Sequence, residues 1–367
     1  MNLLITGGAG FIGSALIRWL LSDDAQAERE VLNLRSVVNL DALTYAGNPA
    51  NLESIQGHPL YRFVHGDITD SSLIERVFRE YEITSVIHLA AESHVDRSID
   101  DPSRFIKTNV EGTYRLLETA RRCWPPGAGH RFVHVSTDEV FGSLAPEAPP
   151  SCETTPYAPN SPYAASKAAA DHLARAYFRT YGLPVLTSNC SNNYGAHQFP
   201  EKLIPLMILN ALESRPLPLY GDGLQIRDWL FVDDHVRALV AILINGVPGE
   251  VYTLGGGTEL TNLALVQTLC AGLDARGPRK QSRYEDLITF VEDRPGHDRR
   301  YAINSSKARH KLGWSPRETL ATGLARTIDW YLANRPWCDA ITQGAYRRER
   351  LGLDSSQKSI SNRKLPP

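Results

Sequence analysis

The stretch LLITGGAGFIGSALIRWLL, residues 3–21, joins an apolar run, three evenly spaced glycines and a second apolar run with helical spacing. The first run predicts a buried strand, and the second predicts a helix over residues 11–22. Because Gly7, Gly10 and Gly13 lie between them, the backbone of the turn can approach a pyrophosphate closely. The helix N-terminus adds partial positive charge at the same point. A plain tight turn is the alternative, but the strand–turn–helix order favours a dinucleotide site.

Short apolar runs alternate with longer helical patterns through the first two-thirds of the chain. The runs are rich in Val, Ile and Leu, as strands buried on both faces are. The expected strands are residues 3–6, 37–40, 61–66, 85–90, 131–136, 185–189 and 250–255. The expected helices between them include residues 11–22, 70–80, 103–123 and 161–181. This alternation predicts an α/β fold with a Rossmann-type doubly wound parallel sheet.

The pattern changes after about residue 195, where the alternation becomes less regular. We expect residues 1–195 plus about 231–255 to form the NAD-binding Rossmann domain. Residues 196–230 plus 256–350 are expected to form a smaller α/β C-terminal substrate domain. The polar residues 351–367 have little to bury and are expected to be a disordered tail.

The composition is that of an ordinary globular chain, with 42% hydrophobic and 22% charged residues. A formal net charge of -2 gives no electrostatic reason to expect nucleic acid or an anionic membrane as a partner. We expect no membrane anchor and no signal peptide, because no apolar run approaches ~18 residues and the N-terminus lacks a basic region. The five cysteines lie far apart without metal-binding spacing, which predicts reduced thiols, a cytoplasmic location and no metal site.

Two aspartates follow predicted strands. Asp41 ends the second strand, where a carboxylate can accept hydrogen bonds from the adenosine ribose and would repel a 2′-phosphate, which favours NAD over NADP. The spacing from Gly13 exceeds the usual ~20 residues, and we interpret DDAQAERE, residues 23–30, as a polar loop insertion that accounts for the excess. Asp67 follows the third strand near the expected place of adenine, although capping a helix over residues 70–80 explains it equally well.

Tyr163 and Lys167 are four residues apart in a helical run and would share one helix face. The lysine ammonium is expected to lower the pKa of the phenol, which makes the tyrosine a usable base. Together with the glycine motif and the strand end at Thr137, this pair resembles the short-chain dehydrogenase/reductase superfamily in its extended, nucleotide-sugar-modifying branch, over nearly the whole chain. The resemblance implies that Tyr163 takes a proton from a sugar hydroxyl while a hydride passes to NAD. It also implies that Lys167 holds the nicotinamide ribose and that Thr137 binds the same sugar oxygen.

Asp138 and Glu139 follow Thr137 in the run STDEVFG, residues 136–142. An acid pair is most often solvated or caps a helix. An epimerase needs no further proton transfer that would give an acid pair a role. Elimination of water needs two more groups, a base that removes a carbon-bound proton and an acid that protonates the departing hydroxyl. The run is similar to that of the nucleoside-diphosphate-hexose 4,6-dehydratases.

That resemblance implies a sequence of proton transfers. Tyr163 takes the C4 hydroxyl proton, Glu139 takes the C5 proton, and Asp138 protonates the C6 hydroxyl, which leaves as water. The hydride that NAD takes up from C4 returns to C6, and C5 is reprotonated. Asp138 then needs a raised pKa, which the adjacent Glu139 would help to raise.

Further stretches resemble the dTDP-glucose 4,6-dehydratase subfamily, namely residues 39–48, 88–99, 189–208, 218–235 and 293–301. The expected catalytic residues are Thr137, Asp138, Glu139, Tyr163 and Lys167. The residues expected at the cofactor are Gly7, Gly10, Phe11, Ile12, Gly13, Asp41, Ala42, Leu43, Thr44, Asp67, Ile68, Leu89, Ala90, Ala91, Glu92, Thr108, Tyr163, Lys167 and Asn193. Those expected at the substrate are Ser93, His94, Thr137, Asn192, Glu201, Lys202, Leu203, Pro218, Tyr220, Arg227, Asn262, Arg294, His297 and Tyr346. Arginine offers bidentate donors to the two phosphates of a sugar nucleotide, although residues 293–301 also fit a solvated surface run.

The resemblance implies dTDP-glucose as the substrate and dTDP-4-keto-6-deoxyglucose as the product, for deoxysugar biosynthesis such as the dTDP-rhamnose pathway. It also implies a homodimer formed through helices 103–123 and 161–181, although their apolar faces could equally pack within one subunit. One departure from the subfamily is Gly195-Ala196, where Gly-Pro is common.

Two other classes of function stay open. One is another enzyme on the same scaffold, such as a 4,6-dehydratase for GDP-mannose or CDP-glucose, an epimerase or a decarboxylase. Charge and spacing do not indicate which base the substrate carries. The preference for thymidine rests on the resemblance of residues 189–208. The other class is a non-enzymatic NAD-binding redox sensor, which would not need the five catalytic residues together.

Overall fold

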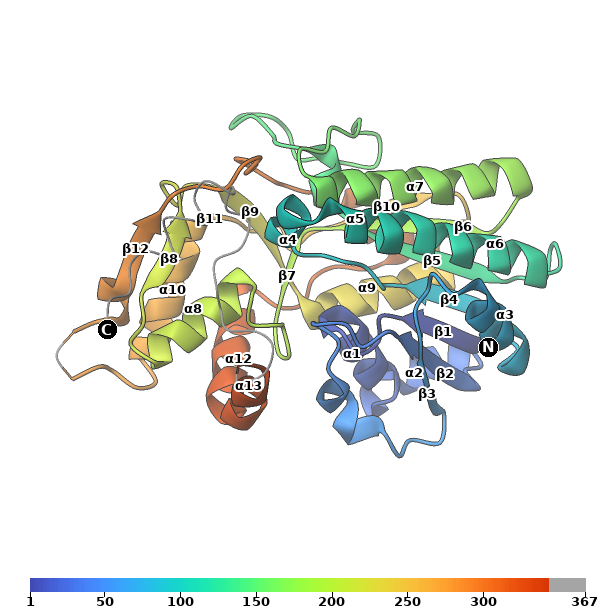
Figure 1. Cartoon of the computed structure of the whole chain (residues 1–367), viewed down its shortest axis with the longest axis horizontal. Coiled ribbons are helices and arrows are strands. Elements are labelled where there is room, and N and C mark those ends of the chain that lie inside the picture. Colours follow the sequence, from blue (N-terminus) through green and yellow to red (C-terminus); the bar gives the residue numbers. More distant parts are fainter. Residues whose placement is uncertain (281, 343–367) are drawn as a thin grey trace.

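The structure is a computed structural model that describes residues 1–280 and 282–342 (Figure 1). Its central feature is a seven-stranded sheet in the order β10-β6-β5-β4-β1-β2-β3, in which every pairing is parallel. The strands are β1 (Asn2–Thr6), β2 (Ser36–Asp41), β3 (Tyr61–His65), β4 (Ser85–His88), β5 (Arg131–Thr137), β6 (Val185–Cys190) and β10 (Val251–Leu254). All seven strands expected from the sequence are present, and the Rossmann-type doubly wound sheet is confirmed. The strand order reverses between β1 and β4, which is where such sheets bind ligands.

Helices cover both faces of this sheet (Figure 1). On one face α1 (Phe11–Leu20) and α9 (Val232–Asn245) pack against Leu3 and Ile5 of β1. On the other, Leu4 joins a core with α3 (Ser71–Glu80), α6 (Thr113–Cys123) and α7 (Pro162–Tyr181). Successive residues of a strand point to opposite faces, so an unbroken apolar run fills both cores.

A second group of elements has its own apolar core and lies at the left of Figure 1. One small sheet has the order β11-β9-β7, and another pairs β12 with β8. The strands are β7 (Asn192–Tyr194), β8 (Leu217–Tyr220), β9 (Ile226–Phe231), β11 (Glu259–Thr261) and β12 (Ile288–Val291). The helices are α8 (Leu203–Leu212), α10 (Asn262–Asp274), η5 (Tyr284–Leu287), α12 (Leu320–Ala333) and α13 (Arg335–Thr342), and α11 (Ser306–Leu312) packs on α9 and β10. The two-domain division stays a prediction, and the expected tail at 351–367 lies outside the described residues.

The segment expected to be a polar loop is helical instead. Residues 23–31 form η1 (Asp23–Ala25) and α2 (Gln26–Val31). Gln26 donates to the Glu30 carboxylate four residues later at 3.0 Å, and Arg29 donates to the Leu20 carbonyl at 2.9 Å. Alanine, glutamine, glutamate and arginine are good helix formers, so local propensity outweighs the polar composition.

The helix expected over residues 103–123 contains an irregular turn. It is divided into α5 (Pro102–Phe105), the π-helical η3 (Ile106–Gly112) and α6. The Asn109 amide exchanges hydrogen bonds with the backbone of Glu92, and a Cβ on Gly112 would lie 2.5 Å from the Ile68 side chain. Such π turns are frequent at functional sites, and this one carries Thr108, which lines the cavity described below. The remaining short elements are η2 (Pro49–Ile55), α4 (Val95–Asp100) and η4 (Asp138–Phe141).

Within residues 1–280 and 282–342, no helix is both long and apolar enough to cross a bilayer. The same residues contain no cluster of His, Cys, Asp and Glu side chains that could hold a metal ion.

Candidate active site

A cavity of about 310 Å³ opens where the strands of the large sheet end. Residues at or just after the ends of β1, β2, β4, β5 and β6 line it, and α7 contributes Tyr163 and Lys167. All five expected catalytic residues line this cavity, and so does every expected cofactor residue except Leu43. The structure therefore brings together residues from positions 7 to 202 of the sequence at the point where the strand order reverses.

The expected substrate residues divide into two groups. Ser93, Thr137, Asn192, Glu201 and Lys202 line the cavity. Those outside its lining are His94, Leu203, Pro218, Tyr220, Arg227, Asn262, Arg294 and His297, and Tyr346 lies outside the described residues. Sequence reasoning missed the lining residues Leu40, Ala46, Gly47, Gly66, Val135, Ser136, Cys190, Ser191, Gln198 and Phe199. Several of these missed residues are sequence neighbours of predicted site residues, so their position next to a motif could have indicated them.

The glycine turn is shaped by close backbone contacts. Gly7 has φ +72°, and a Cβ added to Gly13 would lie 2.2 Å from the Gly7 carbonyl oxygen. Asp41 holds this turn to the second strand: its two carboxylate oxygens accept from the backbone N–H groups of Ala9 and Leu43, each at 2.8 Å. Burial raises the pKa of Asp41 from its ordinary value, although both hydrogen bonds act in the opposite direction. A carboxylate oxygen has more than one lone pair, so each can accept a further hydrogen bond from a ribose hydroxyl. The cradle and its carboxylate fit a dinucleotide.

Alanine at Gly13 should damage this turn much more than alanine at Gly10. The Gly13 Cβ would meet backbone atoms that cannot move aside, and we expect the free energy of unfolding to fall by about 1–3 kcal/mol. At Gly10 the nearest atom is 3.3 Å away and φ is −75°, so the matched variant should keep most of its stability. Chemical denaturation of both variants measures the difference, and equal losses would contradict the steric argument.

Asp67 lines the cavity but is not a helix cap. It accepts from the backbone N–H and the hydroxyl of Thr69 at 2.8 and 2.9 Å. The N-cap of α3 is Asp70, whose carboxylate accepts from the Leu73 N–H at 3.0 Å. The capping alternative for Asp67 is therefore wrong, because the helix starts three residues later than that alternative requires.

The acid pair stands at the junction of β5 and η4, and its two members differ in environment. Asp138 is 3% exposed, and its Oδ2 atom has no hydrogen-bond partner within the described residues. Burial, reinforced by the charge of Glu139, raises the pKa of Asp138 well above its ordinary value, as the sequence predicted. Burial also raises the pKa of Glu139, but Arg294 and Arg227 oppose the shift. Asp138 is thus suited to carry a proton at neutral pH, and Glu139 is the better placed of the two to be ionised.

Thr137 caps η4 and contacts both acids. Its hydroxyl oxygen accepts from the Glu139 N–H at 3.3 Å and donates to the Asp138 carboxyl group at 3.3 Å. Thr137 therefore fixes the backbone turn that presents the acids and lines the cavity itself.

Tyr163 and Lys167 are both buried on the inner face of α7. Burial, followed by the charge of Glu139, raises the pKa of Tyr163 well above its ordinary value. The expectation that Lys167 lowers this pKa is therefore wrong in its net direction. The Lys167 ammonium donates to the Val135 carbonyl at 2.8 Å, while the phenol lies among carboxyl groups in a desolvated cavity. Burial lowers the pKa of Lys167, opposed by the charge of Asp171.

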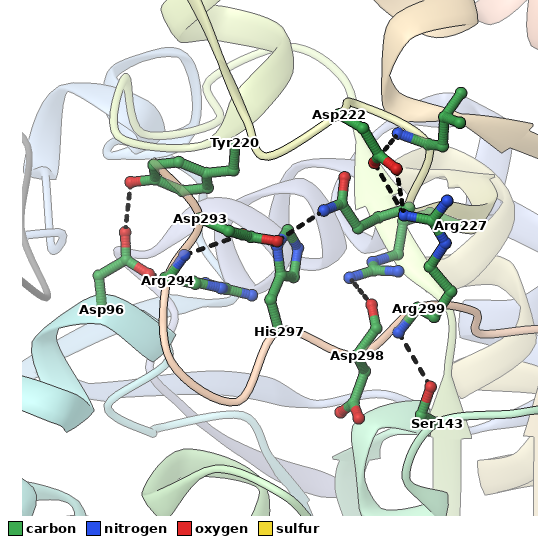
Figure 2. Close-up of polar contacts among 12 residues, drawn as sticks. Asp96, Ser143, Tyr220, Asp222, Arg227, Asp293, Arg294, His297, Asp298 and Arg299 are labelled. Carbon is green, nitrogen blue, oxygen red and sulfur yellow. Dashed lines mark hydrogen bonds and ion pairs between the residues drawn. The ribbon is translucent and has the colours of Figure 1, made fainter. Parts of the chain in front are cut away.

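A second cluster of charges, drawn in Figure 2, contains Arg294 and Arg227, and the charges of these two residues act on Glu139. Arg294 and Tyr220 both bind Asp96 of α4, at 2.7 and 2.9 Å. The pKa of Asp96 is held below its ordinary value although burial acts to raise it, because the Arg294 guanidinium lies beside it. Arg227 donates to the Asp298 carbonyl at 2.9 Å. The sequence named Tyr220, Arg227 and Arg294 but missed Asp96 and Asp298, which lie within the quoted stretches 88–99 and 293–301.

His297 and His94, both expected at the substrate, favour the uncharged form at neutral pH. Burial is the main cause that lowers each pKa to about 4. His297 contacts the Asp293 carboxylate at 2.6 Å (Figure 2). His94 caps α4 by accepting from the Arg97 N–H at 3.4 Å, and so orients this helix rather than lining the cavity.

Glu201 lies at the centre of a further group at the cavity wall. It accepts from the Tyr45 hydroxyl at 2.9 Å and from Arg97 at 3.1 Å, and Arg97 lies 3.9 Å from the centroid of the Tyr45 ring. The adjacent Lys202 donates to the Ser93 carbonyl at 2.8 Å. These contacts join the segment before α8 to the loop after β4.

The remaining expected residues lie at element ends. The Asn193 amide is held by His235 and by the Ser191 carbonyl, both at 2.9 Å, whereas Asn192 Oδ1 has no partner within the described part of the chain. Leu203 and Asn262 are the first residues of α8 and α10, and Pro218 lies in β8.

Comparisons with known proteins agree with this geometry. The family described as GDP-mannose 4,6 dehydratase matches residues 4–327. A dTDP-glucose 4,6-dehydratase of Neisseria meningitidis serogroup B is 54% identical, covering 96% of this chain and 99% of that protein. One of Salmonella typhimurium is 52% identical, covering 95% and 97%. The crystal structure of a Streptomyces venezuelae dTDP-glucose 4,6-dehydratase with NAD and TYD bound is similar with a TM-score of 0.85 and 48% identity, covering 93% of this chain and 100% of that one. A UDP-glucose 4-epimerase of Thermotoga maritima reaches a TM-score of 0.78 at 29% identity, covering 91% and 100%.

Proposed function

This chain belongs to the dTDP-glucose 4,6-dehydratase family, and we propose that it removes water from dTDP-glucose to give dTDP-4-keto-6-deoxyglucose, with NAD as a regenerated cofactor. The observation that carries the proposal is the acid pair of unlike environments, Asp138 and Glu139, in one cavity with Tyr163. Epimerases of the same scaffold need no acid for a leaving hydroxyl. A hydro-lyase needs both an acid and a base.

The chain's own residues supply the proton transfers. Tyr163, as its phenolate, takes the proton of the C4 hydroxyl and becomes the neutral phenol, and the Lys167 ammonium on the same helix face favours that phenolate against the burial that raises its pKa. Thr137 holds the same sugar oxygen by a hydrogen bond. When bound, NAD accepts a hydride from C4 and returns it to C6. The 4-ketone acidifies the C5 proton, so Glu139 can remove it.

Asp138 completes the elimination. Its carboxyl group gives a proton to the C6 hydroxyl, which leaves as water, and C5 is reprotonated when the hydride returns to C6. A buried acid that keeps its proton at neutral pH is ready for this step, while Glu139 close to two arginines is ready to accept one. The two neighbouring carboxyl groups are thus divided into an acid and a base by their surroundings.

The residues proposed to hold NAD are the glycine cradle and Asp41, together with the other cofactor residues that line the cavity. Arg294 and Arg227 are proposed to bind the pyrophosphate of the substrate. Arg294 keeps free donor capacity for this role, because its buried Nε atom has no hydrogen-bond partner within the described residues and a guanidinium has five N–H groups.

We further propose that the protein is a cytoplasmic homodimer and that each subunit has two domains. We also propose that the product of the reaction enters deoxysugar biosynthesis, such as the dTDP-rhamnose pathway. Ile106 of η3, Tyr114 of α6 and Tyr181 of α7 support a dimer through these helices, because their side chains are 54%, 41% and 56% exposed. The separate apolar core around α8, α10 and α12 supports the division into domains. A monomeric mass in solution would contradict the dimer.

The proposed activity is tested by incubating the purified protein with dTDP-glucose and, separately, with UDP-, GDP- and CDP-hexoses. Mass spectrometry should find loss of one water from dTDP-glucose alone, with no net formation of NADH. Water loss from another nucleotide would keep the elimination and discard the assigned base. Absence of water loss from every nucleotide would contradict the proposal and favour a sensor or an epimerase.

A further inference from the structure

A buried carboxylate lies beneath the catalytic residues and has no role in the reaction described above. Asp171 of α7 is 4% exposed. Its Oδ1 atom accepts from His134 at 2.9 Å. Its Oδ2 atom accepts from Ser136 at 2.9 Å, from Tyr157 at 2.8 Å and from Asn189 at 3.1 Å. An ionised carboxylate only accepts hydrogen bonds, so four converging donors fit a permanent charge at this position.

The first link from Asp171 runs to the strand that carries the acids. His134 and Ser136 belong to β5, which ends at Thr137. Asn189 of β6 donates to the Thr137 carbonyl at 3.2 Å as well as to Asp171. One carboxylate therefore fixes two residues of β5 directly and the backbone of Thr137 through Asn189. The position of the turn into η4 depends on this anchor.

The second link runs along the helix to the lysine. Tyr163, Lys167 and Asp171 are spaced four residues apart on α7 and share one face. Burial alone would favour the neutral amine of Lys167, and the charge of Asp171 opposes that loss. The Lys167 ammonium has a carbonyl partner in Val135, which supplies a hydrogen bond but no charge.

Other titratable groups surround Lys167, and they do not replace Asp171. Those facing it are His88 of β4, His134 of β5 and Cys190 of β6, with Asp138 and Glu139 of η4 on the same cavity. Burial lowers the pKa of both histidines, and it raises the pKa of Cys190 to about 12, so these three groups are neutral. Burial raises the pKa of Asp138 and favours its protonated form, and the charge of Glu139 interacts with Arg294 and Arg227.

We propose that Asp171 is a positioning residue of this active site, which anchors the end of β5 to α7 and serves as the fixed counter-ion of Lys167. The proposal rests on the proposed function, because Asp171 acts on the reaction only through Thr137 and Lys167. A merely structural carboxylate would support the fold without setting the charge of the lysine. The two roles are separable by experiment.

The test is Asp171→Asn in the full-length protein as purified, with the titration of Lys167 measured directly. Competitive labelling with acetic anhydride over a range of pH, read by mass spectrometry, gives the pKa of Lys167 without reference to turnover. We expect this pKa to fall by about one unit or more when the neighbouring charge is removed. The alkaline limb of kcat for water loss should move to lower pH by the same amount.

Tyr157→Phe is the matched control. It removes one of the four hydrogen bonds to Asp171 but leaves the carboxylate charge in place. The Lys167 titration should stay at its wild-type position in this variant, even if stability falls. An unchanged Lys167 titration in Asp171→Asn, or an equal shift in both variants, would overturn the proposal.

Measurements on the wild-type protein cover two further outcomes. If Asp171→Asn does not fold, the wild-type labelling still tests the counter-ion, because a Lys167 that titrates below neutral pH with Asp171 present would overturn the proposal. If the wild type removes water from no sugar nucleotide, the proposed function fails while the labelling experiment still reports on Asp171 and Lys167. The two failures are therefore distinguishable.

Discussion

Asp138→Asn is expected to lower the rate of water loss from the sugar nucleotide by about 10²–10⁴-fold, the usual contribution of a positioned general acid. The amide has nearly the size of the carboxyl group but has no acidic proton for the C6 hydroxyl. Removal of the C5 proton by Glu139 does not need Asp138, so exchange of this hydrogen should continue. In deuterated water, mass spectrometry should find substrate that gains deuterium at C5 but keeps its oxygen.

Glu139→Gln is the control for this assignment, because it should stop both C5 exchange and water loss. The pH dependence separates the two acids further. The raised pKa of Asp138 keeps its acid form into the neutral range. Water loss should therefore fall as the pH rises through that value, while C5 exchange persists. Wild-type rates of water loss in Asp138→Asn would assign the proton to another group.

Tyr163→Phe is expected to lower turnover by about 10²–10⁴-fold through a different step. Without the phenolic oxygen, no side chain takes the proton of the C4 hydroxyl, and the 4-ketone that acidifies C5 is not formed. C5 exchange and water loss should therefore disappear together, unlike the result for Asp138→Asn. Binding of dTDP, measured by calorimetry, should remain, because the phenol lies among the catalytic groups rather than in the arginine cluster.

Tyr177→Phe on the same helix is the matched control for the loss of a hydroxyl. Tyr177 is also buried on α7, but its hydroxyl donates to Glu118 at 3.0 Å and does not line the cavity. The rate of water loss catalysed by the Tyr177→Phe variant should stay within about twofold of the wild-type rate, as expected for a substitution away from the site. C5 exchange that survives in Tyr163→Phe would contradict the role of Tyr163 as the base at C4.

The likeness to epimerases explains why one scaffold supports two reactions. The Thermotoga maritima epimerase shares the fold at 29% identity. Function resides in the site and not in the fold. In this chain the acid that an elimination needs is supplied by Asp138, a buried carboxyl group after the end of β5 whose Oδ2 atom has no hydrogen-bond partner within the described residues.

Local sequence patterns determined the fold of the large sheet and most of its cavity. Apolar runs and helical spacing act within a few residues, so all seven strands of that sheet could be predicted within two residues of their observed ends. The glycine turn and the spacing of Tyr163 and Lys167 also depend on neighbours close in sequence. The helix at residues 26–31 was missed because its polar composition was given more weight than its propensity.

Only the tertiary structure decided the charge states and the partners within the site. Arg294 and Arg227 lie more than eighty residues beyond Glu139 in the sequence, yet they oppose the rise of its pKa, while at Asp138 the charges of Glu139 and Asp228 reinforce burial and Arg227 acts more weakly. The opposite net shift of Tyr163, the pairing of Asp96 with Arg294 and the anchor at Asp171 arise in the same way. The pKa of a group depends on desolvation and on charges within a few ångströms, and those distances exist only after strands and loops far apart in the chain have packed together.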